Sequence, residues 1–324
     1  MTRIVGLNDI KQAAARISGK VRHTPLLRGD KLDNLWGAEV YFKPENLQVT
    51  GSFKIRGATN KILSLGDEER ARGIIASSSG NHAQGVAYAA KTLRIKATLV
   101  LPENAPRSKV EGCKSLGAEV ILHGFDSIQR YNKLYEIQAE KGYTLVHSYN
   151  DPDLIAGQGT SGLEIMEDLP DVDTLVVPLG GGGLLAGVAA AVKETRPTVR
   201  VVGVEPANIQ RYAESRKAGK PVKVEMGPTL ADGLMITVTG ENNYPLIDKY
   251  VDEIVPANDD FIRKALMEIV FKGKLLVEPS AAVGVAAALE GNFKVKPGEK
   301  ICFFLSGGNI DPEKLADFIA RETA

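Results

Sequence analysis

The sequence alternates short apolar runs with longer segments of helical periodicity, and this alternation restricts the fold more than any other feature. Strands are expected at 73–76, 97–102, 119–122, 144–147, 174–177, 199–204 and 300–305. Helices are expected between them, among others at 83–93, 126–141, 159–167, 184–194 and 280–289. Strands that are separated by helices form parallel sheets with both faces covered and right-handed crossovers. The pattern therefore predicts an α/β fold of doubly wound sheets.

The same pattern suggests two domains. A chain of 324 residues can form two domains or one large one. The alternation resumes after Pro152, which favours two. We expect a small domain at 52–149, and a large domain that combines 150–324 with the first segment, 1–51.

Composition and charge exclude several classes of partner. Forty basic and forty acidic residues balance, so we expect neither nucleic acid nor an anionic membrane as a partner. Cys113 and Cys302 are far apart and lack metal-ligand spacing, which argues against a disulfide framework or a zinc site. The N-terminus lacks the apolar core of a signal peptide, so we expect a cytoplasmic protein.

Four consecutive glycines, 180–183, follow one of the predicted strands. They lie in an uncharged run, 175–192, that has the length of a membrane span. Pro178 and the glycines would break a spanning helix, so a strand, a loop and a buried helix explain the run better. Glycines expose backbone N–H groups without side chains in the way, and at the start of a helix such a loop can hold a phosphate.

A dinucleotide site is the alternative for this loop. Gly181, Gly183 and Ala186 fit the fingerprint G-x-G-x-x-A, and Glu205 ends the next strand at about the ribose-binding distance. This would make the protein a nicotinamide-dependent enzyme. The match consists of one short pattern that occurs often by chance.

A single lysine, Lys54, stands out in the loop 50–58. It lies between Phe53 and Ile55, among small and hydroxyl side chains, directly before a predicted helix. Partial burial lowers the pKa of a lysine, and the unprotonated amine is the nucleophile that forms an imine. The alternative is a lysine at a helix start whose ammonium group extends into water.

Two more polar loops follow predicted strands. The segment 77–82 carries three serines, Asn81 and His82 at a helix start, which suits a carboxylate and lets Asn81 donate to a ring oxygen. A helix cap would explain one serine, and a local hydrogen bond would explain His82.

Ser306, next to Gly307 and Gly308, can reach the nitrogen of a heterocycle. Carboxyl ends of parallel strands are where such sheets bind ligands.

An imine-forming lysine, a phosphate loop, a carboxylate loop and a ring-facing hydroxyl together fit pyridoxal phosphate and an amino acid. The chain resembles the pyridoxal-phosphate-dependent serine/threonine dehydratase and serine racemase family, which has the tryptophan-synthase-β-like fold (fold type II). Few residues follow the last motif, as in the short, catabolic threonine dehydratases. The resemblance rests on the motifs at 51–58, 78–82, 156–160, 180–183, 203–206, 231–233, 278–280 and 306–309.

This resemblance implies a role for several residues toward the cofactor. Lys54 would bind it through an imine and act as a base on one face of the substrate. The other implied cofactor contacts are Phe53 beside the ring, Asn81 at the ring hydroxyl, Ser306 at the ring nitrogen, and Gly180, Gly181, Gly182 and Gly183 at the phosphate.

The resemblance also implies the substrate site. Ser78, Ser79 and Gly80 would receive the substrate carboxylate, with His82 and Tyr149 as further substrate contacts. Ser79 matches the residue that acts in racemases as the base on the opposite face. Tyr149 stands where racemases resemble one another in having asparagine and dehydratases often have an aromatic residue.

The implied reaction is β-elimination of water from L-threonine or L-serine, which gives 2-oxobutyrate or pyruvate and ammonia. The neutral hydroxyl of Ser306 at the ring nitrogen favours prompt elimination. Serine racemisation and dehydration of 3-hydroxyaspartate remain alternatives within the family. A non-catalytic amino-acid sensor on the same fold is the alternative from another class, and the family suggests a homodimer.

Many members of the family hold a divalent cation near the residue that corresponds to Glu205, with a carboxylate a few residues further on. Arg211 stands at that place in this chain. Two positive charges repel each other, which makes a metal site doubtful, so we prefer an ion pair between Glu205 and Arg211 and keep a divalent cation as the alternative.

Overall fold

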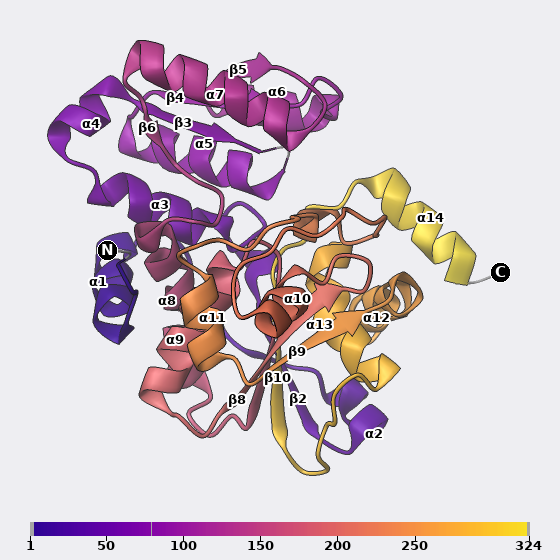
Figure 1. Ribbon diagram of the computed structural model, residues 1–324. Coiled ribbons are helices and arrows are strands. Elements are labelled where there is room, and N and C mark those ends of the chain that lie inside the picture. Colours follow the sequence, from indigo (N-terminus) through magenta and orange to yellow (C-terminus); the bar gives the residue numbers. More distant parts are fainter. Residues whose placement is uncertain (1–2, 79, 323–324) are drawn as a thin grey trace.

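The computed structural model describes residues 3–78 and 80–322 and contains two sheets, one above the other in Figure 1. The larger sheet has six strands and contains the N-terminal and C-terminal parts of the chain. The smaller sheet has four strands and is formed by the segment between them. Within the described residues, no helix is long and apolar enough to cross a membrane.

The six-stranded sheet is parallel except at one edge, where β1 pairs antiparallel with β2. One of its two central strands, β10, lies between β2 and β7. In spatial order the strands are β1 (Leu27–Arg28), β2 (Glu39–Pro44), β10 (Lys300–Leu305), β7 (Thr174–Pro178), β8 (Arg200–Pro206) and β9 (Glu253–Ala257).

Helices cover both faces of this sheet. Along β10, Ile301 and Phe303 join the hydrophobic core on one face, while Cys302 and Phe304 join the core on the other. This alternation is the two-residue period of a strand that is buried on both sides. The helices are α1 (Leu7–Ile17), α2 (Asp33–Trp36), α8 (Pro152–Asp168), α9 (Gly183–Thr195), α10 (Arg211–Ala218), α11 (Tyr244–Tyr250), α12 (Asp259–Phe271), α13 (Pro279–Glu290) and α14 (Pro312–Glu322).

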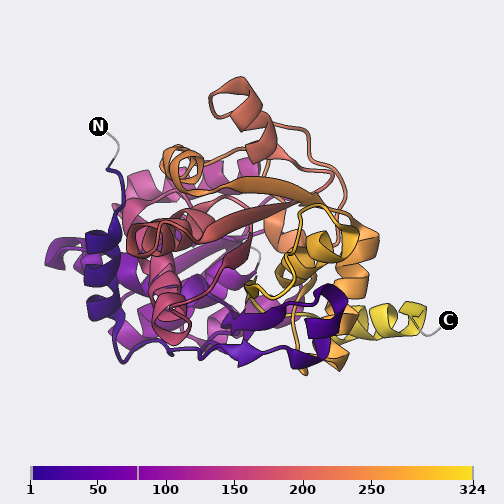
Figure 2. The ribbon, with the colours of Figure 1, turned by 90° about the horizontal axis from the view of Figure 1, so that it is seen from below.

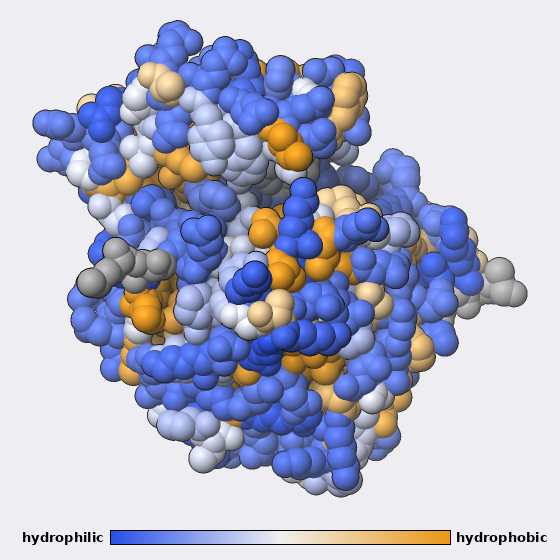
Figure 3. Space-filling view, in the orientation of Figure 1, coloured by the Kyte–Doolittle hydropathy of each residue, from blue (hydrophilic) through white to orange (hydrophobic). Residues whose placement is uncertain are grey.

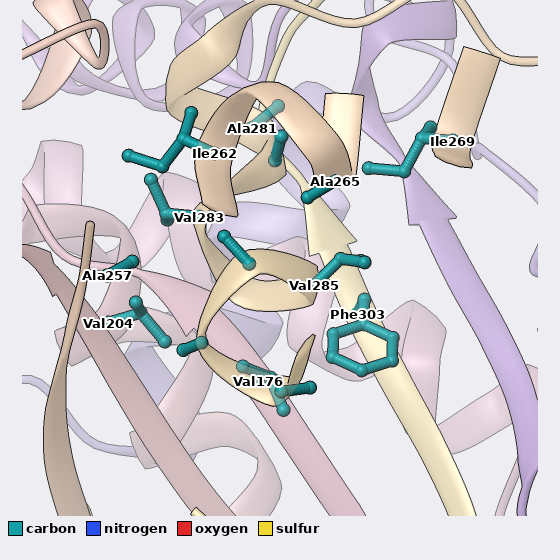
Figure 4. Close-up of a cluster of buried hydrophobic side chains, with 14 of the residues drawn as sticks. Val176, Val204, Ala257, Ile262, Ala265, Ile269, Ala281, Val283, Val285 and Phe303 are labelled. Carbon is teal, nitrogen blue, oxygen red and sulfur yellow. The ribbon is translucent and has the colours of Figure 1, made fainter. Parts of the chain in front are cut away.

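On one face, α13 packs directly on the strands and α12 packs behind it, as Figure 4 shows. The labelled side chains come from β7, β8, β9 and β10 and from the two helices, namely Val176, Val204, Ala257, Ile262, Ala265, Ile269, Ala281, Val283, Val285 and Phe303. The opposite core is formed by α1, α8, α9 and α11. The last helix, α14, extends from the body of the molecule in both ribbon views (Figures 1 and 2).

The four-stranded sheet is parallel throughout and is also covered on both faces. Its spatial order is β5 (Glu119–Leu122), β4 (Ala97–Leu101), β3 (Ile74–Ser77) and β6 (Thr144–Leu145). Its helices are α3 (Lys54–Ser64), α4 (Asp67–Arg72), α5 (Asn81–Leu93), α6 (Arg107–Ser115) and α7 (Ser127–Lys141). The predicted α/β fold of two doubly wound sheets is confirmed.

Several elements differ from the sequence-based expectation, and α8 and β9 are the clearest cases. The helix expected at 159–167 begins at Pro152, because the Asp151 carboxylate accepts hydrogen bonds from the N–H groups of Asp153 and Leu154. Proline is well suited to this first helical position, since no N–H is needed there. The edge strand β9 was not expected as a strand; it contains Pro256, which an edge strand tolerates.

Candidate active site

A cavity of about 600 Å³ lies between the two sheets. Figure 3 shows the hollow, with hydrophobic side chains gathered along its lower rim. It adjoins the carboxyl ends of β3, β7 and β10, where the three polar loops follow their strands. Apart from Ser79, which lies outside the described residues, every predicted site residue lines this cavity: Phe53, Lys54, Ser78, Gly80, Asn81, His82, Tyr149, Gly180, Gly181, Gly182, Gly183 and Ser306.

Lys54 is the first residue of α3, and its amine faces the cavity from the four-stranded side. Its Nζ donates a hydrogen bond to the Ser148 carbonyl at 2.9 Å and lies 5.0 Å from the centroid of the Phe53 ring. Burial lowers the pKa of Lys54 to about 8, although the negative charge of Glu278 acts in the opposite direction. A lysine with this pKa is partly unprotonated near neutral pH, as imine formation requires.

The glycine loop presents its carbonyl groups to protein partners. The Gly181 carbonyl accepts hydrogen bonds from the Tyr212 hydroxyl at 3.0 Å and from Asn243 Nδ2 at 2.7 Å. In the part of the chain that the structure describes, the N–H groups of the four glycines donate to no protein acceptor. The loop leads into the 13-residue helix α9, whose first residue is Gly183, so it combines free N–H groups with a helix N-terminus.

Side chains could not replace these glycines without disturbing the cavity wall. A Cβ atom on Gly181 would lie 2.2 Å from Cγ of Tyr149, and one on Gly182 would lie 1.9 Å from the Tyr212 hydroxyl. Gly182 also has a φ of +96°, which favours glycine. The loop therefore fits the phosphate of pyridoxal phosphate, because an anion can approach bare backbone there.

Asn81 is held by two neighbours. Its Nδ2 donates to Glu278 at 2.7 Å, and its Oδ1 accepts from Asn309 Nδ2 at 2.8 Å. Burial raises the pKa of Glu278 to about 7, and the negative charge of Asp232 contributes. The sequence showed Glu278 and Asn309 only as parts of motifs, since their contacts with Asn81 join distant segments.

Ser306 directly follows β10 and is almost completely buried. Its carbonyl accepts a hydrogen bond from the Phe53 N–H at 3.1 Å, and Ser52 pairs with Gly307 in an isolated antiparallel bridge. These contacts place the Ser306 loop directly beside the Lys54 loop. Ser306 and Lys54 both line the cavity, so a hydroxyl group and an amine come from adjacent loops.

Histidine and tyrosine side chains form the wall near β6. His82 Nε2 bonds to the Val146 carbonyl at 2.9 Å, while its Nδ1 is buried without a partner among the described residues. His147, which the sequence did not single out, accepts from the N–H groups of Tyr149 and Asn150. Burial lowers the pKa of His82 to about 3 and that of His147 to about 4, so both rings are neutral at pH 7.

The Tyr149 ring packs edge-on against His147, with 4.7 Å between the ring centroids. Burial raises the pKa of Tyr149 to about 12, so its phenol is neutral. Neutral hydrogen-bonding groups can contact a polar substrate without binding its charge. The unpartnered Nδ1 of His82 is an acceptor there, because the carbonyl partner requires the proton on Nε2.

Glu205 and Arg211 form the predicted ion pair, with 3.7 Å between Oε1 and Nη1. The Glu205 carboxylate also accepts the N–H groups of Tyr212 and Ala213, both at 3.0 Å, and it is fully buried. It therefore has no access to a ribose, which argues against the dinucleotide interpretation of the glycine loop. Among the described residues, no group of three or more His, Cys, Asp or Glu side chains could hold a metal ion.

Comparison with known proteins agrees with this geometry. The sequence pattern of the pyridoxal-phosphate dependent enzymes matches residues 17–307. The chain is 48% identical to an L-threonine ammonia-lyase of Thermotoga maritima over 308 residues, which cover 95% of this chain and 76% of that protein. It is 42% identical to a catabolic L-threonine dehydratase of Staphylococcus aureus over 319 residues, covering 98% and 92% of the two chains.

Solved structures show the same fold. Maize serine racemase superimposes with a TM-score of 0.93 at 38% identity, covering 99% of this chain and 98% of that one. The T.th. threonine deaminase gives a TM-score of 0.89 at 40% identity, with 94% and 99% covered. From the pattern match, the sequence identities and the shared fold together, we conclude that this chain belongs to the family of pyridoxal-phosphate dependent enzymes.

Proposed function

We propose that this protein is a pyridoxal-phosphate-dependent ammonia-lyase that converts L-threonine and L-serine to 2-oxobutyrate and pyruvate, with release of ammonia. The observation that carries the proposal is the position of Lys54, whose low-pKa amine shares one cavity with the glycine loop, Asn81 and Ser306. The relatives named threonine ammonia-lyase and threonine dehydratase support the same reaction.

Pyridoxal phosphate, when bound, supplies an aldehyde carbon for amines and a conjugated ring that takes up electrons from the substrate. In our proposal Lys54 holds this carbon and, once the substrate amine has replaced it, takes the proton from the substrate Cα. A pKa of about 8 suits this role, because the amine can accept a proton near neutral pH and give it up again.

The other predicted residues would orient the cofactor and the substrate. The N–H groups of 180–183 would hold the phosphate, and Asn81, fixed by Glu278 and Asn309, would contact the ring hydroxyl. The hydroxyl of Ser306 would contact the ring nitrogen without protonating it, which favours departure of the β-hydroxyl.

The substrate would lie toward β3 and β6. Ser78, Ser79 and Gly80 are proposed to bind its carboxylate, at the N-terminus of α5, where an anion is favoured. His82 and Tyr149 would contact the remainder of the substrate with neutral groups. We add His147 to this wall, because its ring supports Tyr149 and lines the cavity.

Serine racemisation is the second candidate, and the close fold match to maize serine racemase favours it. Both reactions begin with removal of the Cα proton. They differ in whether the β-hydroxyl leaves or a proton returns on the opposite face. Tyr149 fills the wall beside the glycine loop, and its resemblance to dehydratases makes elimination our first choice.

We further propose domain boundaries at 51/52 and 149/150, a homodimer, and a cytoplasmic location with no nucleic-acid or membrane partner. The change from one sheet to the other near these residues supports the boundaries. The balance of forty basic and forty acidic residues supports the statement on partners.

Product analysis tests the proposed reaction. The purified holoenzyme is given L-threonine, L-serine or 3-hydroxyaspartate, oxoacids are measured in a coupled assay, and serine enantiomers are separated chromatographically. We expect oxoacid and ammonia from L-threonine and L-serine, and none from a Lys54→Ala variant. D-Serine without oxoacid would contradict the proposal in favour of racemisation, and binding without turnover would favour an amino-acid sensor.

A further inference from the structure

We propose that the guanidinium group of Arg211 acts as a built-in cation that turns the N–H groups of the glycine loop toward the cofactor phosphate. Arg211 would be a positioning residue, since it acts on the phosphate through the backbone of the loop. A second part of the proposal is that phosphate binding then needs no metal ion. This inference rests on the proposed role of 180–183 as the phosphate site.

Arg211 is a charged residue with no exposure to solvent, and its guanidinium group donates to three backbone carbonyls. Its Nε and Nη2 donate to the Gly180 carbonyl at 3.0 and 2.7 Å, and Nη2 also donates to the Leu179 carbonyl. Its Nη1 donates to the Ile209 carbonyl at 2.9 Å. A planar fork of five N–H donors can serve several carbonyls at once, which a lysine cannot do in the same way.

The effect on the loop follows from the geometry of the peptide bond. In a trans peptide, the carbonyl of one residue and the N–H of the next point in opposite directions. Arg211 holds the carbonyls of Leu179 and Gly180, and Tyr212 and Asn243 hold the carbonyl of Gly181. The N–H groups of Gly180, Gly181 and Gly182 are therefore directed away from these partners. Because all three residues line the cavity, this places successive donors where a phosphate can bind.

The charge of Arg211 adds to this arrangement. The guanidinium is bonded directly to the carbonyls of the loop, so its positive charge lies just behind the proposed phosphate site. Glu205 lies at 3.7 Å from Nη1, and its carboxylate is shared with two N–H groups of α10. The carboxylate is thus fixed on the side of α10, while the fork of Arg211 contacts the loop.

The same contacts leave no role for a divalent cation at this place. Hard cations bind carboxylate and carbonyl oxygens, and Arg211 already occupies such oxygens at Glu205, Gly180 and Ile209. A second positive charge among them would be repelled. We therefore expect the affinity for pyridoxal phosphate to be independent of divalent cations.

A comparison of pyridoxal phosphate with pyridoxal separates the effect of Arg211 on phosphate binding from its effect on the rest of the cofactor. The full-length apoenzyme is titrated calorimetrically with pyridoxal phosphate and with pyridoxal, which lacks the phosphate, and with inorganic phosphate. For Arg211→Met we expect the affinity for pyridoxal phosphate and for inorganic phosphate to fall about tenfold to a hundredfold, since a charge-assisted hydrogen-bond set is lost. The affinity for pyridoxal should stay within about twofold of the wild type. An equal loss for both cofactor forms, or no loss, would overturn the proposal.

Two further arginine variants complete the comparison. Arg211→Lys keeps the charge but not the fork, and should fall between the wild type and Arg211→Met. The matched control is Arg216→Met, because Arg216 lies on the same helix but donates to the carbonyls of Ile247 and Val251, away from the glycine loop. It should keep the preference for pyridoxal phosphate. Loss of that preference in the control would overturn the assignment to Arg211.

If Arg211→Met does not fold, the variant Tyr212→Phe tests the same claim, that the loop carbonyls position the N–H donors. This variant removes one hydroxyl, which holds the Gly181 carbonyl, and leaves the ring in place. We expect a severalfold loss of affinity for pyridoxal phosphate with no change for pyridoxal. Unchanged affinity for both would contradict the claim that the loop carbonyls position the donors.

A chelator tests the second part of the proposal. The affinity of the wild type for pyridoxal phosphate should be the same with EDTA and with added Mg²⁺; a loss with EDTA that Mg²⁺ restores would overturn it. A wild type with no preference for pyridoxal phosphate over pyridoxal would instead refute the phosphate role of 180–183. A wild type that shows this preference and an Arg211→Met variant that keeps it would refute only the role of Arg211.

Discussion

Two buried ionisable residues, Lys54 and Glu278, have pKa values that shift toward each other. Burial disfavours the charged form of each, so the pKa of Lys54 falls to about 8 and that of Glu278 rises to about 7. The charge of Glu278 raises the pKa of Lys54 and so limits the fall. The pair therefore titrates close to neutral pH, where a group that must both accept and release a proton is most effective.

The rate at which pyridoxal phosphate attaches to the apoenzyme should rise with pH, with a midpoint near pH 8 and a plateau at higher pH, since the unprotonated amine of Lys54 is the reacting form. Glu278→Gln should shift the midpoint of this profile to lower pH, because the variant removes a negative charge that favours the ammonium form. It retains an oxygen that can accept the hydrogen bond from Asn81.

Stopped-flow absorbance across the pH range measures both profiles, with Lys54→Ala as the variant that should show no attachment. A midpoint that stays in place or moves upward in Glu278→Gln would show that Glu278 does not act on Lys54 through its charge.

The glycine loop packs tightly against the segment after β6. Tyr149 follows β6, and its ring and backbone occupy the space beside Gly181 and Gly183. A Cβ on Gly183 would lie 2.7 Å from the Tyr149 carbonyl oxygen. Tyr149 thus links the four-stranded unit to the proposed phosphate loop.

Gly181→Ala should therefore destabilise the protein by about 1–3 kcal/mol and weaken cofactor binding, because the new methyl group overlaps the Tyr149 ring. The free energy of unfolding in urea and the dissociation constant of pyridoxal phosphate measure the two effects.

The matched control is Gly112→Ala in α6, where a Cβ would meet no atom within 4 Å. It should be neutral or stabilising by up to about 1 kcal/mol, since alanine favours helix more than glycine does. If Gly181→Ala behaved like this control, the contact with Tyr149 would not restrict the loop.

At the scale of the whole molecule, a buried group of charges joins the lysine helix to the six-stranded unit. Arg56, two residues after Lys54 on α3, pairs with Glu45 at 2.7 Å and with Glu164 of α8 at 2.6 Å. Arg56 and Glu45 are fully buried. Breaking such a pair by removing one partner leaves an uncompensated charge, so these contacts hold α3 in one place.

Much of the fold followed from local patterns. Most residues of the strands β3, β4, β7, β8 and β10 are buried, on both faces of their sheets. Such strands appear in the sequence as short apolar segments between turn residues, so they could be predicted. The segment 175–192, which has the length of a membrane span, contains most of β7, the glycine loop and most of α9. The start of α8 was not recognised because Pro152 also suits a turn, and β9 because glutamate and proline are uncommon in strands.

The sequence predicted less of the candidate site than of the fold. Lys54, Asn81, the four glycines and Ser306 stand in motifs of unusual composition, and the structure brings these loops to one cavity. Glu278 meets Asn81 across 197 positions, and Arg211 meets Gly180 across 31. Residues so far apart in the sequence do not lie within one helix or strand, so no local sequence pattern indicates such a contact.

An absorption spectrum of the purified holoenzyme, before and after borohydride, tests the central claim most directly. Our account predicts a visible band that borohydride removes, with the reduced cofactor attached to Lys54 in the digested protein. A protein that shows no such band when supplied with pyridoxal phosphate, or that carries the label on another lysine, would contradict it.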